Sequence, residues 1–155
     1  TILKDDEGHR YLYSYVIMYQ WGWESVVKKK KYLLDKATDF DKAKFFGASA
    51  QRTYLIYATG SKLYAYDYVA EKVQLLQDFG DQEITLLHCD LLVETGAGDD
   101  FFYVGTYDPS LPKETGGTLT KYRVVNDPNN IIVEKVPGFS WSGLCKIKSI
   151  DFKKY

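Results

Sequence analysis

The chain has 155 residues with 20 basic and 21 acidic side chains, and its net charge is −1. This length is sufficient for one domain with a hydrophobic core. The balanced charge gives no broad basic surface, so we expect no nucleic-acid partner. No run of 18 apolar residues is present that could span a bilayer as a helix. Fourteen Tyr, eight Phe and three Trp against a single Met favour β-sheets.

The first 42 residues are the least regular part of the sequence. Residues 10–19 (RYLYSYVIMY) predict a strand or a pair of strands. Residues 25–34 (SVVKKKKYLL) are ambiguous between a helical turn and a strand. We therefore expect residues 1–42 to form an irregular N-terminal segment or a divergent repeat.

A regular meander follows. Residues 43–50 predict a short first strand, and residues 54–59 and 62–67 predict a hairpin closed by Gly60-Ser61. Residues 72–77 predict the next strand. β-Branched and aromatic residues bounded by turn residues are typical of strands, and a four-stranded meander is the repeating unit of a β-propeller.

The pattern then repeats. Residues 83–93 predict a new strand, and residues 100–107, 117–125 and 131–136 resemble the three strands of the first meander. Residues 144–152 resemble residues 86–92, and both segments carry a Cys. We therefore predict that Cys89 and Cys145 lie on equivalent strands, both largely buried and not joined in a disulfide.

These observations predict an all-β fold made of β-propeller-like meander repeats. Residues 43–155 would form two propeller-type blades and a final strand. Propellers close with about four to eight blades, so we expect an incomplete propeller that belongs to a larger one. A compact β-sandwich built from the same meanders is the alternative.

The residues that could carry chemistry are few. His9 lies in a charged stretch and is expected to be a solvated loop residue. His88 and Cys89 are adjacent on a predicted strand, so they would point to opposite faces and could not act as base and nucleophile. No His/Cys spacing fits a metal site, so we expect no catalytic residue, no metal and no cofactor.

The aromatic residues are the better candidates for function. Tyr19, Trp21 and Trp23 surround Gly22, and in an extended chain both Trp rings would face the same way. Such a surface could bind a sugar ring or a partner protein, or it could pack beneath the N-terminal segment. Trp141, in the sequence FSWSG, is expected to be buried.

Residues 54–68 (YLIYATGSKLYAYDY) and 141–155 (WSGLCKIKSIDFKKY) resemble the C-terminal propeller portion of PKD-like family surface lipoproteins of Bacteroidetes. The resemblance implies a cell-surface location at the outer membrane, with a lipid anchor on a segment outside this sequence. It also implies partners, namely a TonB-dependent transporter barrel and its lipoprotein lid. We therefore expect a noncatalytic binding or scaffold module of a peptide or glycan import complex. The alternative is a glycan-processing enzyme with its site on a propeller face.

Overall fold

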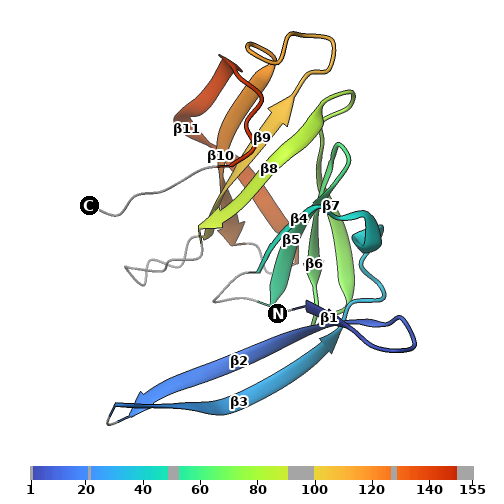
Figure 1. The fold of residues 1–155 in the computed structure, drawn as a ribbon, viewed down its shortest axis with the longest axis vertical. Coiled ribbons are helices and arrows are strands. Elements are labelled where there is room, and N and C mark those ends of the chain that lie inside the picture. Colours follow the sequence, from blue (N-terminus) through green and yellow to red (C-terminus); the bar gives the residue numbers. More distant parts are fainter. Residues whose placement is uncertain (1, 21, 49–52, 91–99, 127–128, 150–155) are drawn as a thin grey trace.

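The computed structural model describes residues 2–20, 22–48, 53–90, 100–126 and 129–149 (Figure 1). For residues 14–20, 23–29, 45, 46, 48, 90, 100 and 126, the description is limited to the backbone. Within these ranges, eleven strands form three antiparallel sheets, accompanied by one 3₁₀ turn, η1 (Phe40–Lys42). None of the described residues forms an α-helix. The predicted all-β class is therefore confirmed.

The middle sheet is a meander of four strands in the order β4-β5-β6-β7. Its strands are β4 (Phe45–Ala48), β5 (Tyr54–Thr59), β6 (Lys62–Asp67) and β7 (Lys72–Asp78). Gly60, with a φ of 60°, begins the tight turn between β5 and β6. This sheet is the first meander that the sequence predicts, and its strands are confirmed.

The C-terminal sheet has the strand order β11-β10-β9-β8. Its strands are β8 (Glu83–Asp90), β9 (Asp100–Tyr107), β10 (Gly117–Asn126) and β11 (Ile131–Leu144). β11 continues past the predicted end at Val136 because a bulge absorbs the residues around Gly138, which has a φ of 78°. Pairing with β10 moves from Tyr122↔Lys135 to Thr120↔Ser140 across this bulge.

The predicted final strand at residues 144–152 is wrong for the part that the structure describes. Leu144 ends β11, and residues 145–149 have no regular secondary structure. Residues 150–152 lie outside the described residues. The chain leaves the sheet here because Lys146 anchors it elsewhere: its backbone N–H donates to Lys113 O, and its Nζ lies 2.8 Å from Glu83 Oε2. That hydrogen bond holds the pKa of the Glu83 carboxyl below its usual range.

The proposed equivalence of the two cysteines is also wrong. Cys89 lies on β8 and is partly buried against the core, whereas Cys145 follows β11 and is exposed. Neither cysteine is in a disulfide, as expected. The shared Cys and flanking aliphatic residues suggested equivalent strands, but Cys145 lies in the segment where the chain leaves the sheet.

The N-terminal sheet consists of β1 (Ile2–Lys4), β2 (Arg10–Gln20) and β3 (Trp23–Leu33), in that order. β2 and β3 form a long hairpin that extends away from the two four-stranded sheets (Figure 1). The ambiguous segment at residues 25–34 is thus almost entirely a strand, which ends at Leu33. Pairing with β2 fixes this conformation, because the run of lysines has no strand preference of its own.

The middle and C-terminal sheets share one hydrophobic core. Alternate residues of β5 and one residue of β6 meet the inner face of the C-terminal sheet. The buried residues of this core are Tyr54, Ile56, Ala58, Leu63, Ile84, Leu87, Phe102, Val104, Tyr122 and Val124. β4 and β8, which are edge strands of their sheets, approach closely, since Gly47 lies directly against Cys89. Two four-stranded sheets therefore pack face to face.

The other face of the middle sheet is also buried. Leu55, Tyr57, Tyr64 and Tyr66 pack there against residues from β2 and from the segment that follows β3, namely Leu12, Leu34, Ala37 and Phe40. The Tyr57 hydroxyl donates to Thr38 O at 2.7 Å. Burial on both faces explains the continuous apolar sequence of β5. The described sheets do not close into a ring, and their packing is consistent with the sandwich alternative.

Candidate functional site

Tyr19 and Trp23, two of the three aromatic residues predicted to form a binding surface, lie near the tip of the β2–β3 hairpin. The backbone register pairs Tyr19 with Glu24 and Gln20 with Trp23. Gly22 has a φ of 79°, which suits the reversal of the chain. Trp21 lies outside the described residues, and the structure describes the backbone alone for Tyr19 and Trp23. Their role as a common binding surface stays a prediction.

A second aromatic group lies on the outer face of the C-terminal sheet. We call it the aromatic–lysine face; it consists of Phe101, Tyr103, Lys121, Phe139 and Trp141. Strand alternation places this face opposite the core. Phe102, between Phe101 and Tyr103, and Tyr122, next to Lys121, both point into the core. Tyr103 pairs directly with Lys121 across β9 and β10.

The ammonium group of Lys121 lies among three of these rings. Its Nζ is 4.6 Å from the ring centroid of Phe101, 5.1 Å from that of Phe139 and 5.4 Å from that of Tyr103. Such cation–π contacts hold the lysine against the sheet. Among the described residues, no carboxylate forms an ion pair with Lys121. Its positive charge is therefore available to an anionic group of a ligand.

The β11 bulge brings two large side chains to this face. Phe139 and Trp141 pack edge to face with their centroids 5.8 Å apart. They are 42% and 43% exposed, so the expected burial of Trp141 is wrong. The reason is that β11 is an edge strand, and beyond its bulge it turns this pair away from the core. Exposed neighbouring aromatic rings are typical of recognition surfaces.

His88 and Cys89 take opposite faces of β8, as strand geometry predicts. The His88 ring lies near Tyr103, with centroids 6.5 Å apart, whereas Cys89 packs against the core between the sheets. The prediction that the two side chains point to opposite faces of one strand is therefore confirmed.

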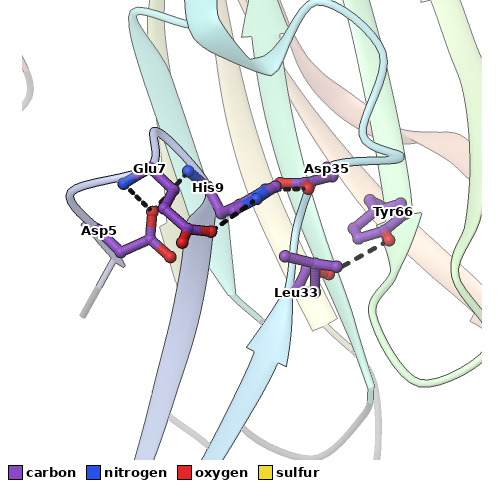
Figure 2. Close-up of polar contacts among 6 residues, drawn as sticks. All are labelled: Asp5, Glu7, His9, Leu33, Asp35 and Tyr66. Carbon is purple, nitrogen blue, oxygen red and sulfur yellow. Dashed lines mark hydrogen bonds and ion pairs between the residues drawn. The ribbon is translucent and has the colours of Figure 1, made fainter.

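A cleft of about 640 Å³ lies at the base of the hairpin, between residues 7–10 and 34–42. Figure 2 shows His9 directed at Asp35, with His9 Nδ1 2.6 Å from Asp35 Oδ2. Glu7 lies on the other side of the ring, 3.7 Å from Nε2. Asp5 Oδ1 accepts the backbone N–H groups of Glu7 and His9 and so fixes the loop. The hydrogen bond to Asp35, followed by the charge of Asp35, raises the pKa of His9.

The other charges of this cleft are paired as well. Arg10 Nε lies 2.5 Å from Asp41 Oδ1, and Lys42 Nζ lies 3.0 Å from Asp39 Oδ1. Within the described part of the chain, no group of three or more His, Cys, Asp or Glu side chains could hold a metal ion. The arrangement joins the N-terminal sheet to the segment after β3, which is a structural role.

The sequence alone did not predict the His9–Asp35 pair or the aromatic–lysine face. His9 is in a loop as expected, but its partner Asp35 is 26 residues away and no local pattern links the two. The aromatic–lysine face combines β9, β10 and β11, so it emerges only after the strands are paired. The alternation of residues 100–107 and 117–125 contained the signal, since Phe101, Tyr103 and Lys121 share one face once the register is known.

None of the helical segments in the described ranges has the length and apolar character needed to cross a membrane. Comparison with known proteins finds no matching family model, no matching curated protein and no matching solved structure.

Proposed function

We propose that this chain is a noncatalytic binding module and that the aromatic–lysine face is its recognition surface. The observation that carries the proposal is the ammonium group of Lys121, which lies within reach of three rings and beside the exposed Phe139–Trp141 pair, and which pairs with no carboxylate of the described residues. Aromatic rings can stack on a sugar ring or accept an apolar peptide side chain, and the ammonium can pair with a carboxylate. A peptide or glycan that carries an acidic group fits this chemistry.

The absence of catalysis in this proposal rests on how the described carboxylates are used. The carboxylates of the cleft at the base of the hairpin lie at ion-pair distance from His9, Arg10 or Lys42, and these ion pairs stabilise loops. A glycosidase needs two carboxyl groups facing each other across a sugar-binding space, one as an acid and one as a base or nucleophile. The cleft offers paired charges in place of that arrangement.

We further propose that the two four-stranded sheets are successive blades of a β-propeller. Support comes from the identical meander order along the chain, from face-to-face packing and from the close approach of the first strands, β4 and β8. In such an arrangement the module would act as an accessory lipoprotein at the cell surface. Its partners would be the TonB-dependent barrel and lipoprotein lid of an outer-membrane nutrient import complex, as the sequence resemblance implies.

Binding to a defined panel tests the recognition surface. The purified chain is titrated with neutral oligosaccharides, uronate-containing oligosaccharides and acidic peptides, and compared with the variants Trp141→Ala and Lys121→Met. Truncating a central aromatic anchor typically costs about 2 kcal/mol, which is roughly a thirtyfold rise in Kd. Leu75→Ala is the matched control, because Leu75 is similarly exposed but lies on β7.

The proposal predicts that an acidic member of the panel binds, that Trp141→Ala and Lys121→Met weaken its binding, and that Leu75→Ala does not. Unchanged affinity in both face variants would rule out this surface. Release of a cleaved product during the titration would contradict the noncatalytic assignment.

A further inference from the structure

A polar pocket of about 260 Å³ lies on the inner side of the C-terminal sheet, and Trp141 of the aromatic–lysine face also contributes to its lining. The end of β7 and the turn before β8 form one wall, and β9, β10 and β11 form the other. Its lining includes side-chain oxygen or amide groups from Gln82, Thr106, Thr118, Thr120, Ser140 and Ser142. The two sheets therefore enclose an apolar core at one end of this face and a pocket rich in hydroxyl groups at the other.

The sequence of β10 produces this change of character. Its inward-facing residues run from Val124 and Tyr122, which belong to the core, to Thr120 and Thr118, which line the pocket. Each is two residues from the next, so all four share one face of the sheet. Thr106 on β9 pairs with Thr118, which adds a further hydroxyl directly opposite.

Hydrogen bonds among these side chains fix their orientation. Thr106 Oγ1 donates to Gln82 Oε1 at 2.8 Å and lies in a short hydrogen bond with Thr118 Oγ1. Since the Thr106 proton is used for Gln82, Thr118 is the donor in that pair. Thr120 and Ser140 are 3.1 Å apart and form a second pair. The pocket is thus built from side chains that hold each other in place.

This arrangement leaves specific hydrogen-bonding groups directed at the pocket. Gln82 uses its carbonyl oxygen for Thr106, and its amide nitrogen has no partner among the described residues. Within the same part of the structure, the Ser142 hydroxyl is likewise without a partner. One hydroxyl of the Thr120–Ser140 pair keeps its proton for a ligand. The pocket therefore presents both donors and acceptors on a rigid frame.

The other lining residues define the kind of ligand. Phe79, Tyr122 and Trp141 add aromatic surface. Among the described residues that line the pocket, no Asp or Glu is present and Lys135 is the single charged side chain, exposed at the rim. Donors, acceptors and apolar surface without a fixed opposite charge match a sugar ring, which has hydroxyl groups at its edge and C–H groups on its faces.

We propose that this pocket binds a single neutral hexopyranose unit. This goes beyond the recognition surface proposed above, because Gln82, Thr118 and Ser142 line the pocket and do not belong to the aromatic–lysine face. Trp141 borders both sites. Gln82 would donate to ring hydroxyls, Ser142 and the Thr120–Ser140 pair would donate or accept, and Phe79 and Tyr122 would contact the C–H face.

The test is a titration with methyl α-D-glucopyranoside, methyl α-D-mannopyranoside and methyl β-D-galactopyranoside, followed by saturation-transfer difference NMR. At least one should bind saturably. Gln82→Met should raise its Kd about tenfold, because one hydrogen bond in a desolvated site has roughly that effect. Ser142→Ala should also weaken binding, and since Ser142 is exposed and unpartnered within the described part, this variant should fold normally.

Two further variants separate this site from its neighbours. Leu75→Ala should leave the affinity for the methyl glycosides unchanged, because this exposed residue of β7 does not line the pocket. Lys121→Met should also leave it unchanged, because Lys121 lies on the aromatic–lysine face and does not line the pocket. If none of the three glycosides binds saturably, or if Gln82→Met and Ser142→Ala bind as well as the wild type, the proposal is wrong. If Leu75→Ala or Lys121→Met abolishes glycoside binding, the assignment of the sugar to this pocket is wrong. Each of these results is independent of acidic-ligand binding at the outer face.

Discussion

Because β4 and β8 approach closely, the side chain of Cys89 decides whether an alanine at position 47 stabilises or destabilises the protein. A Cβ atom added at Gly47 would lie 2.5 Å from Cys89 Cβ and closer still to Cys89 Sγ, whereas real Cβ contacts essentially never fall below 3.0 Å. Gly47 does not have a positive φ, so alanine suits its backbone. Replacing glycine by alanine at such a position would ordinarily stabilise a protein by about 0.4–1 kcal/mol. Overpacking of a well-packed core costs about 1–3 kcal/mol.

We therefore expect Gly47→Ala to destabilise the protein by about 1–2 kcal/mol, because the steric conflict exceeds the backbone gain. For a chain of this size, each kcal/mol corresponds to a fall in Tm of about 2–4 °C. Urea-induced unfolding, analysed by linear extrapolation, measures the free energy directly.

The same substitution in a Cys89→Gly background is the matched control. Removing the Cys89 side chain leaves its Cα 3.8 Å from the added Cβ, an ordinary contact distance. Gly47→Ala should then be neutral or stabilising, so that the two backgrounds differ by at least about 1 kcal/mol. If Gly47→Ala is neutral or stabilising while Cys89 is present, the face-to-face packing of β4 on β8 is refuted.

Two other predictions concern contacts between distant segments. Gln74 on β7 is hydrogen-bonded to β11 of the other sheet: its Nε2 donates to Ile131 O at 2.6 Å, and its Oε1 accepts the Ile131 N–H at 3.1 Å. Gln74→Leu should lower the free energy of unfolding in urea by about 1–3 kcal/mol. An unchanged midpoint would mean that this pair of hydrogen bonds contributes nothing to stability. His9, whose pKa is raised above 6.5 by Asp35, should stabilise the fold fully below pH 6.5 and lose that contribution as the pH rises through the raised value. Asp35→Asn should lower the His9 midpoint in an NMR titration and reduce this pH dependence, and an unchanged midpoint would show that the pair does not form in solution.

Much of the strand pattern could be predicted because it depends on local sequence. Gly60 allows the tight turn between β5 and β6, and the continuous apolar run of β5 agrees with burial on both faces. The end of β11 could not be predicted in this way. Pro137 has no backbone N–H and Gly138 adopts a positive φ, so the local sequence indicates a turn. Pairing with β10 resumes beyond the bulge, and this depends on residues more than fifteen positions away.

The candidate sites depend on strand pairing even more than the strand boundaries do. The sequence directed attention to Tyr19, Trp21 and Trp23 because these aromatic residues are neighbours along the chain. The aromatic–lysine face needs the register of three strands, and the hydroxyl-lined pocket also needs the packing of two sheets. Neither is encoded in the spacing of residues within one segment. The expected burial of Trp141 was wrong, because its exposure depends on the edge position of β11 and no local sequence pattern shows that position.

The proposed recognition surface is the outer face of the C-terminal sheet, and the tip of the β2–β3 hairpin is the alternative that the sequence predicted. Hydroxyl-radical footprinting separates the two, because it reports the accessibility of individual Tyr, Phe and Trp side chains. When the acidic ligand that binds best in the panel is added, we expect the oxidation of Tyr103, Phe139 and Trp141 to fall. Protection of Tyr19, Trp21 and Trp23, with Phe139 and Trp141 oxidised as in the free chain, would contradict it.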